Sequence, residues 1–252
     1  DSGDAFFNDY KGIYLDKIAL DTGCCFNNTQ CDTGTPCSAG YCVGNKCEHE
    51  EVCSTCKRTQ STVVFALDRS ATMLANTTSG TSKWNLLKAA MDQVLPNYDF
   101  RLNLAAKAFP SVGSVTPCDV DPGLDLDFHS SSEALALFLG SASPTTGQSP
   151  IDGGLEAILT AFQLPAVKAE KGSKYVVLIT DGGESCSGDP VLYASALQGI
   201  GVRTIVIAYD NALTKAELTE LSVAGGLGRT TPTPTSTTYI RAGVDAPDLE
   251  AA

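Results

Sequence analysis

The sequence has no long hydrophobic run, and positive charge is scarce relative to negative charge. Its longest apolar stretches, such as 63–67 and 175–179, have the length of a single strand, whereas a membrane-spanning helix needs about 20 consecutive apolar residues. We therefore expect no transmembrane helix. The 17 Lys and Arg against 29 Asp and Glu leave a formal net charge of −12. Because phosphate backbones repel such a surface, we also expect no binding to nucleic acids.

Histidine is nearly absent, with only His49 and His129 among 252 residues. A hydrolase of the Ser-His-Asp type would have to use His129, and the sequence lacks the Gly-x-Ser-x-Gly turn that presents a nucleophilic serine. The acidic segment 119–127 also departs from a calcium-binding EF-hand, because Gly123 stands at the fifth place and Ser130 at the place of the bidentate glutamate. We interpret this segment as an acidic hairpin.

Cysteine, in contrast, is abundant and unevenly placed. Eight of the ten cysteines lie between Cys24 and Cys56, and the other two are Cys118 and Cys186. The even number and the turn-rich spacers predict a disulfide framework, which fits the closely spaced cysteines better than a zinc site does. If the eight pair among themselves, Cys118 is left to pair with Cys186. Because disulfides form in oxidising compartments, we expect a protein located outside the cytosol.

The composition changes near residue 58, where the cysteines stop and strand-like apolar runs begin. We predict a small disulfide-stapled module over residues 1–58 and an α/β domain over 59–252, since the first segment is too short to bury a core of its own. The chain begins at Asp1 without a charged-then-apolar leader. We expect a secretory signal that has been removed or lies upstream, and a lipid anchor on an upstream cysteine is compatible with this sequence.

Strand-like and helix-like segments alternate from residue 59 onward. Strands are predicted at 62–67, 100–109, 124–128, 174–180 and 202–209. Helices are predicted at 83–95, 132–139, 150–164, 190–198 and 215–223. The proline-rich segment 230–238 is predicted to be a loop. Continuous Val, Ile and Leu runs that alternate with helices are typical of a doubly wound, mostly parallel central sheet with helices on both faces.

Two of the predicted strands run directly into an aspartate, Asp68 after the first and Asp181 after the strand at 174–180. Ligands bind beyond the carboxyl ends of parallel strands. Ser149, at the start of a predicted helix, adds its hydroxyl to those of Ser70 and Thr72 in the segment 68–73. Carboxylate and hydroxyl oxygens favour Mg²⁺ or Mn²⁺ over zinc. Because each aspartate alone is equally well explained as a helix cap, the prediction of a metal site depends on their combination.

Three segments together carry a resemblance to a known family: DRSATM at 68–73, GQSPI at 147–151 and LITDGGE at 178–184. In order and spacing they resemble the loops of the metal-ion-dependent adhesion site of a von Willebrand factor type A domain, over roughly residues 61–252. The resemblance implies the Rossmann-like fold of that family. It also implies a metal-ligand set, which comprises Asp68, Ser70, Thr72, Ser149 and Asp181.

Two of these positions depart from the family pattern, with Thr72 where serine is usual and Ser149 where threonine is usual. Both residues keep the hydroxyl that a metal ion needs. Thr145 and Thr146 lie close to Ser149 in the sequence, so the identity of the second-loop ligand stays open. Because the ligands are hard oxygen donors, we expect Mg²⁺ as the ion, with Mn²⁺ and Ca²⁺ as alternatives.

The resemblance further implies a secreted or surface-displayed adhesion protein and not an enzyme. An ion held by only two carboxylates keeps water positions, which a glutamate or aspartate of an extracellular protein partner can replace. Two alternatives stay open: a scaffold subunit of a cell-surface assembly with a vestigial metal site, and a metal-dependent hydrolase with Glu184 as its general base. We interpret the glycosylation sequons at Asn27 and Asn76 as chance matches in a bacterial protein, because a glycan at Asn76 would crowd the metal site.

Overall fold

The computed structural model describes residues 37–38, 41–42, 60–77, 79–99, 101–114, 116–144, 147–209, 215–226 and 240–242. Most of the predicted cysteine-rich module lies outside these residues. Its described part is a pair of short antiparallel strands, β1 (Cys37–Ser38) and β2 (Tyr41–Cys42). The disulfide framework of the eight N-terminal cysteines and the domain boundary at residue 58 therefore stay predictions. The loop predicted at 230–238 also lies outside the described residues.

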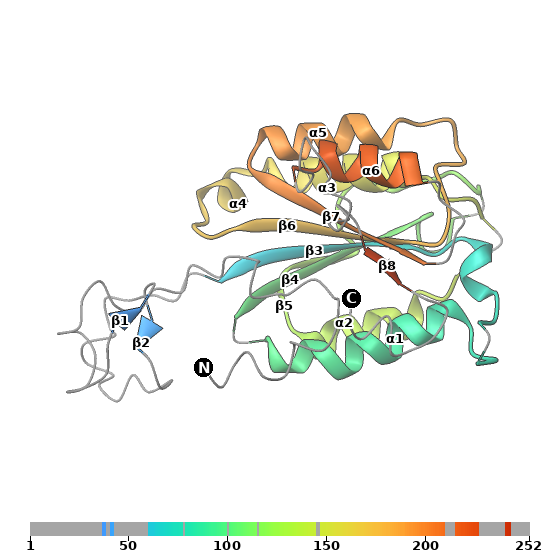
Figure 1. The fold of residues 1–252 in the computed structure, drawn as a ribbon, viewed down its shortest axis with the longest axis horizontal. Coiled ribbons are helices and arrows are strands. Elements are labelled where there is room, and N and C mark those ends of the chain that lie inside the picture. The colour runs from blue at the N-terminus through green and yellow to red at the C-terminus, as the bar shows by residue number, and fades with distance from the viewer. Residues whose placement is uncertain are drawn as a thin grey trace.

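A six-stranded sheet forms the centre of the structure from residue 60 onward (Figure 1). Its strands follow the order β5-β4-β3-β6-β7-β8. The parallel strands are β3 (Ser61–Asp68), β4 (Leu102–Phe109), β6 (Lys174–Thr180), β7 (Val202–Tyr209) and β8 (Ile240–Ala242). The edge strand β5 (Leu126–Ser130) is antiparallel to β4. The mostly parallel sheet predicted from the sequence is confirmed.

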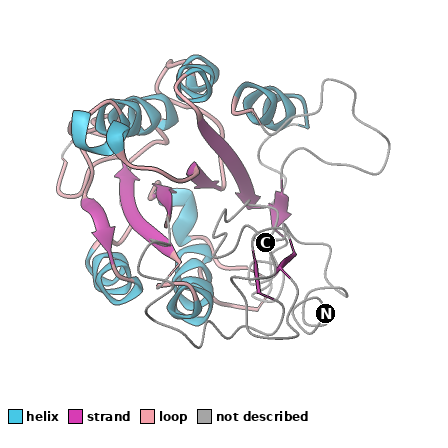
Figure 2. Cartoon of the chain, turned by 90° about the vertical axis from the view of Figure 1, so that its left-hand side faces the viewer, coloured by secondary structure: helices cyan, strands magenta, loops and turns pink. Residues whose placement is uncertain are grey.

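Helices cover both faces of this sheet, as the end-on view shows (Figure 2). The helices α1 (Lys83–Val94) and α2 (Ser132–Ser141) pack on one face. Two 3₁₀ turns, η4 (Ala71–Leu74) and η5 (Leu95–Asn97), lie on either side of α1 in the chain. The doubly wound arrangement follows, because the remaining helices lie on the opposite face.

That opposite face is covered by the helices of the second half of the domain (Figure 1). They are α3 (Ile151–Phe162), the short α4 (Pro165–Ala169), α5 (Pro190–Gly199) and α6 (Lys215–Ala224). None of the helices in the described ranges combines the length and the apolar character that crossing a membrane requires.

The central strand β3 is buried along its whole length, because it lies in the middle of the sheet with helices on both faces. Successive side chains of a strand point to opposite faces. Val63, Phe65 and Leu67 accordingly join the core beneath α1 and α2, whereas Val64 and Ala66 join the core beneath α3. Burying a Val or Leu side chain contributes about 1.5–3 kcal/mol, so the two cores hold the ends of β3 firmly in place.

The helix predicted at 150–164 is shorter than expected. It ends at Phe162, and α4 begins separately at Pro165. Leu164 has an extended backbone, with a ψ angle of 135°, which is the conformation that a residue before proline favours. Because Pro165 stands at the start of α4, where a helix needs no backbone donor, it begins a new helix instead of continuing α3.

The strand β5 begins later than predicted, at Leu126 instead of at residue 124. The side chain of Asp125 explains the shift, because its Oδ2 accepts a hydrogen bond of 2.8 Å from the backbone N–H of Ala108 in β4. A carboxylate thus takes the β4 donor at the point where pairing with β5 would otherwise continue.

Candidate metal centre

The two aspartates singled out in the sequence meet at the carboxyl edge of the sheet. β3 ends at Asp68, and the neighbouring parallel strand β6 ends at Thr180, immediately before Asp181. Adjacent parallel strands end at the same edge, so the topology brings the two side chains together. Both residues are deeply buried, with exposed fractions of 0% for Asp68 and 2% for Asp181.

Each oxygen of Asp68 has a hydrogen-bond donor. Its Oδ1 accepts a hydrogen bond of 2.8 Å from the backbone N–H of Ser70. Its Oδ2 accepts from the hydroxyls of Ser149, at 2.9 Å, and of Thr180, at 2.6 Å. Burial raises the pKa of Asp68 to about 6, although the hydrogen bonds from Thr180 and Ser70 act in the opposite direction. The site therefore disfavours an uncompensated negative charge on this carboxyl group.

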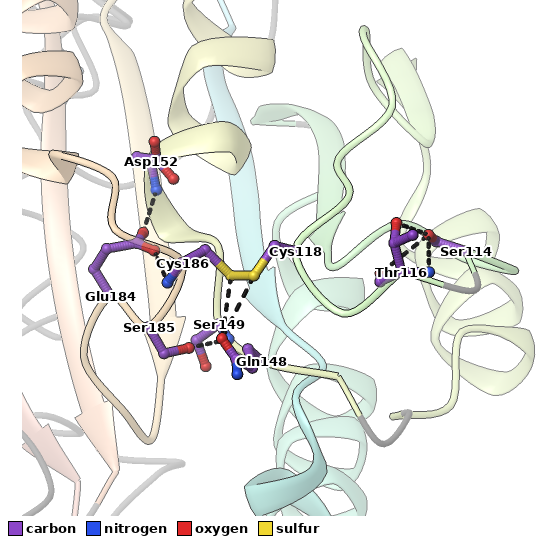
Figure 3. The surroundings of a disulfide bond; sticks show 9 residues. All are labelled: Ser114, Thr116, Cys118, Gln148, Ser149, Asp152, Glu184, Ser185 and Cys186. Carbon is purple, nitrogen blue, oxygen red and sulfur yellow. Dashed lines mark hydrogen bonds between the residues drawn. A yellow bond between two sulfur atoms is a disulfide. The ribbon is translucent and has the colours of Figure 1, made fainter.

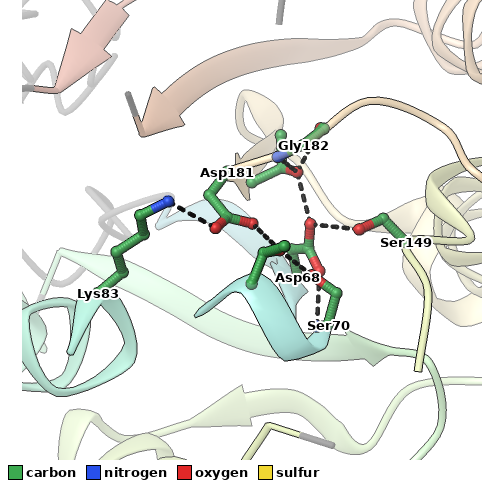
Figure 4. Close-up of polar contacts among 8 residues, drawn as sticks. Asp68, Ser70, Lys83, Ser149, Asp181 and Gly182 are labelled. Carbon is green, nitrogen blue, oxygen red and sulfur yellow. Dashed lines mark hydrogen bonds and ion pairs between the residues drawn. The ribbon is translucent and has the colours of Figure 1, made fainter. Parts of the chain in front are cut away.

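The two oxygens of Asp181 have different kinds of partner (Figure 4). Oδ1 accepts a hydrogen bond of 2.7 Å from the hydroxyl of Thr72, whereas Oδ2 lies 2.8 Å from the ammonium nitrogen of Lys83. The Thr72 hydroxyl also lies 2.9 Å from the hydroxyl of Ser70. The Ser70 and Thr72 side chains thus extend from the end of β3 to the end of β6.

The structure brings all five sequence-predicted ligand residues into one hydrogen-bonded cluster. This cluster, called the metal centre below, comprises Asp68, Ser70, Thr72, Ser149 and Asp181. Only Thr72 among them is exposed, so the metal centre opens to solvent on the side of the turn η4. Thr145 and Thr146, the alternatives to Ser149, lie outside the described residues.

Ser149 is held in place by the loop that follows β6 (Figure 3). Its backbone N–H donates to the hydroxyl of Ser185 at 2.8 Å, and the backbone N–H of Ser185 donates back to the Ser149 carbonyl at 3.2 Å. The next residue, Cys186, forms a disulfide with Cys118. This bridge confirms the pairing predicted for the two isolated cysteines. It ties the loop after β4 to the loop that positions Ser149.

The helix that follows Ser149 approaches the sheet closely because it carries glycine at the contact. A Cβ atom at Gly154 would lie 2.5 Å from Cδ1 of Phe109, the last residue of β4. A side chain there would push α3 away from the strand ends. Gly154 therefore helps to keep the start of α3, and Ser149 before it, next to Asp68.

Two residues of the site, Thr180 and Lys83, do not stand out in the sequence as site residues. Thr180 is the last residue of a predicted buried strand, and the structure shows that its hydroxyl contacts Asp68. Lys83 is the first residue of a predicted helix. Its signal was present in the sequence, because a lysine in the first turn faces the positive end of the helix dipole, and the first turn of α1 has no acidic residue.

Arg69 is a third residue that the sequence pattern does not reveal. It stands between the predicted ligands Asp68 and Ser70 in the sequence, and no local pattern gives it a role. It is 2% exposed. Its guanidinium group donates to the backbone carbonyls of Pro110, Ser111 and Ser143 at 2.7–2.8 Å. Burial lowers the pKa of Arg69 from its ordinary value, and Asp125 acts against this. Arg69 thus fixes the first loop to two neighbouring loops.

The structure gives other roles to Glu184, the candidate base of a metal-dependent hydrolase, and to His129, which a Ser-His-Asp hydrolase would have to use. Both oxygens of Glu184 accept backbone N–H groups, from Asp152 at 2.9 Å and from Cys186 at 2.6 Å, so this carboxylate caps the start of α3. Burial raises the pKa of Glu184 from its ordinary value. His129 lies 2.9 Å from Glu170, near the amino ends of β3 and β4 and thus at the edge of the sheet opposite the metal centre.

The donor atoms of the metal centre fit a hard divalent cation. Carboxylate and hydroxyl oxygens are the ligands that Mg²⁺ and Mn²⁺ prefer. Within the described ranges, no three or more His, Cys, Asp or Glu residues form a group that could hold a metal ion, so a site built on Asp68 and Asp181 needs hydroxyl groups as further ligands. A bound cation would also offset the burial of Asp68, which by itself favours the protonated acid.

Comparisons with known proteins agree with this geometry. A family model described as von Willebrand factor type A domain matches residues 62–239. The uncharacterized protein YwmC of Bacillus subtilis (strain 168) is 30% identical over 172 residues, which cover 65% of this chain and 73% of YwmC.

Two solved structures share the fold. One is proximal thread matrix protein 1 from the mussel byssus, whose metal-ion-dependent adhesion site (MIDAS) motif is occupied by zinc. It is 20% identical with a TM-score of 0.53, and the match covers 75% of this chain and 42% of that chain. The pilus adhesin SpaC from Lactobacillus rhamnosus GG is 14% identical with a TM-score of 0.55, over 77% of this chain and 29% of that chain. The chain thus spans less than half the length of either protein, and the likeness concerns the fold.

Proposed function

The chain belongs to the von Willebrand factor type A domain family, and from this we propose that it is an extracellular ligand-binding protein of the adhesion type. In the proposed function, a divalent cation at the metal centre binds a glutamate or aspartate side chain of a protein partner. One observation carries the proposal: oxygen-bearing side chains from three separate loops form a single hydrogen-bonded cluster around two buried carboxyl groups.

The proposed metal ligands are the five residues of the metal centre, and the proposed ion is Mg²⁺, with Mn²⁺ and Ca²⁺ as alternatives. When bound, such an ion supplies a Lewis-acidic centre that attracts anionic oxygens. The protein's own part is to orient the ligands. The backbone of Ser70 and the hydroxyl of Thr180 fix the Asp68 carboxylate, and the Cys118–Cys186 bridge fixes the loop of Ser149. The zinc-occupied MIDAS motif of the mussel protein supports a divalent cation at this position.

A carboxylate is the proposed partner group because of the charges at the metal centre. Two carboxylates offset the charge of a divalent cation, and the ammonium group of Lys83 lies 2.8 Å from one of them. An anionic oxygen from a partner therefore finds a favourable electrostatic environment. The exposed position of Thr72 supplies the side from which that partner can approach.

We further propose a location at the cell surface or in another oxidising compartment, such as the bacterial periplasm. The Cys118–Cys186 disulfide supports this location, because such bridges are rare in the cytosol. The B. subtilis relative supports a bacterial origin, and the fold shared with a pilus adhesin supports a location at the bacterial surface. In this proposal, residues 1–58 form a disulfide-stapled module ahead of the type A domain over 59–252.

The proposed function is tested by thermal melting of the full chain and of Asp68→Ala, with EDTA or with Mg²⁺, Mn²⁺ or Ca²⁺. An ion that binds only the native state raises the free energy of unfolding by about 2.7 kcal/mol at a hundred times its dissociation constant. We expect Mg²⁺ or Mn²⁺ to raise the midpoint of the wild type and not that of Asp68→Ala. The control is Asp127→Ala, which removes an exposed carboxylate on β5 and should respond to the ions as the wild type does.

A scaffold function with a vestigial metal site is the second candidate. It is favoured by the Lys83–Asp181 ion pair, because a lysine already compensates one of the two carboxylates. If none of the three ions shifts the wild-type midpoint, the adhesion proposal is wrong and the scaffold function replaces it.

A further inference from the structure

We propose that Lys83 is a resident cation of the metal centre, which weakens the binding of a divalent cation and keeps the metal-free fold stable. The inference rests on the proposed function, because it concerns the affinity of the same site. Lys83 lies outside the three ligand-bearing loops, and it is not part of the disulfide. Its basis is the position, the burial and the contact of the Lys83 side chain.

The position of Lys83 runs against the preferences of its helix. Lys83 is the first residue of α1, whose N-cap is Ser82. The amino end of a helix carries a partial positive charge, which favours acidic side chains and disfavours a lysine. Lys83 is nevertheless only 8% exposed, and a lysine is rarely buried unless it is paired. An attraction from outside the helix must therefore hold it there.

Asp181 supplies that attraction. The Lys83 ammonium nitrogen lies 2.8 Å from Asp181 Oδ2, with side-chain exposures of 10% and 0%. A buried carboxylate that loses its partner is strongly destabilising. Lys83 thus supplies, in the metal-free protein, the positive charge that a metal ion would otherwise have to provide. Folding does not then depend on the metal.

The same contact makes Lys83 a competitor of the metal. Asp181 offers Oδ1 on the side of the Thr72 hydroxyl and Oδ2 on the side of Lys83. A divalent cation that uses Asp181 must share the carboxylate with the ammonium group or displace it. Because like charges repel strongly where water is excluded, Lys83 lowers the affinity of the metal centre for the ion.

The test measures Mg²⁺ binding to the EDTA-treated full chain by calorimetry, and thermal melting with EDTA and with saturating Mg²⁺. Lys83→Met keeps the length of the side chain without its charge, and Lys83→Arg keeps the charge. Lys88→Met is the matched control, because it makes the same change at a half-buried lysine of the same helix.

We expect Lys83→Met to bind Mg²⁺ more tightly than the wild type, on the order of ten- to hundredfold. Its melting midpoint should fall below that of the wild type in EDTA, and Mg²⁺ should remove most of this difference. Lys83→Arg and Lys88→Met should keep the affinity of the wild type.

The outcomes separate this inference from the proposed function. Equal Mg²⁺ affinities of the wild type and Lys83→Met would overturn the inference and leave the proposed function standing. Binding by Lys83→Met alone would support the inference and overturn metal-dependent adhesion by the natural chain. Absence of binding in both proteins would overturn both. A midpoint loss that is the same in EDTA and in Mg²⁺ would assign Lys83 to packing and overturn the inference.

If Lys83→Met does not fold in EDTA, the double variant Lys83→Met/Asp181→Asn decides the question. It removes both members of the ion pair, so the inference expects a midpoint near that of the wild type in EDTA and no response to Mg²⁺. A midpoint far below the wild type would show that the loss does not come from an uncompensated Asp181 carboxylate, which would overturn the inference.

Discussion

The two edges of the central sheet both carry clusters of polar side chains, and the clusters differ in burial. At the carboxyl edge, Asp68 and Asp181 are at most 2% exposed, and their contacts are 2.6–2.9 Å long. At the amino edge, the side chains of His129 and Glu170 are 64% and 26% exposed. There, Glu170 lies 2.9 Å from His129, and its contacts with Thr62 and Asn103 are 3.5 and 3.4 Å long.

The difference shows which of two similar clusters is a candidate binding site. A contact between partly exposed side chains, such as His129–Glu170, contributes little to stability, because water screens its groups. A buried carboxylate, in contrast, must be compensated by donors or by a cation. The carboxyl edge meets this need with hydroxyls and Lys83, all of them aimed at two carboxyl groups. Burial, more than the number of polar groups, therefore marks the site.

The largest expected effect is a difference in the free energy of unfolding between two variants. One loses a buried carboxylate at the carboxyl edge, and the other loses a more exposed carboxylate at the amino edge. Asp181→Ala leaves Lys83 without this carboxylate, and breaking a buried pair costs about 3–5 kcal/mol. Glu170→Ala breaks the exposed contact with His129, which is worth about 0–1 kcal/mol. Urea unfolding in EDTA measures both free energies. Equal losses for the two variants would contradict the contrast between the edges.

The next effect concerns the Cys118–Cys186 disulfide, which lies at the carboxyl edge. Among the described residues, the amino edge has no such bridge. Cys118 and Cys186 are 68 residues apart, and a bridge of this kind contributes about 2–4 kcal/mol. The variant Cys118→Ser/Cys186→Ser should lose that amount in urea unfolding. Its Mg²⁺ affinity should also fall, because the bridge fixes the loop that holds Ser149. A loss of stability with unchanged Mg²⁺ affinity would mean that the bridge only staples two loops.

The third effect, similar in size to that of the disulfide, is a pH dependence of the metal-free protein. Burial raises the pKa of Asp68 from 3.8 to about 6, so the native state keeps a proton that the unfolded chain has lost between about pH 4 and pH 6. The free energy of unfolding should therefore fall as the pH rises through this window and stay level above it, a change of about 3 kcal/mol.

Urea unfolding in EDTA between pH 4 and pH 7 measures this dependence. Asp68→Asn should lose most of it, whereas Asp127→Asn, at an exposed carboxylate, should keep the wild-type profile. If Asp68→Asn and the wild type lose stability in parallel across the window, the dependence belongs to other groups. In saturating Mg²⁺, the wild type should be stabilised most above pH 6, where Asp68 binds the ion without first losing a proton.

Local patterns were enough to predict the sheet and most of the site. The strand at 174–180 and the strand at 202–209 were predicted with their observed bounds, because continuous apolar runs match strands that are buried on both faces. Asp68 and Asp181 were found because each directly follows such a run. Contacts between distant segments were harder to foresee. The lysine that pairs with Asp181 lies 98 residues away in the chain, and no local period connects the two.

The sequence by itself was thus enough to predict the fold, the two aspartates and the disulfide pair. The fold and the aspartates follow from short-range patterns, and the disulfide pair follows from counting the cysteines. Burial and direction did not follow from pattern. Glu184 became a helix cap, Thr180 a donor to Asp68, and Lys83 a charge within the metal centre. These roles arise because packing removes water from particular side chains, and a group without water must bond to whichever neighbour the fold places beside it.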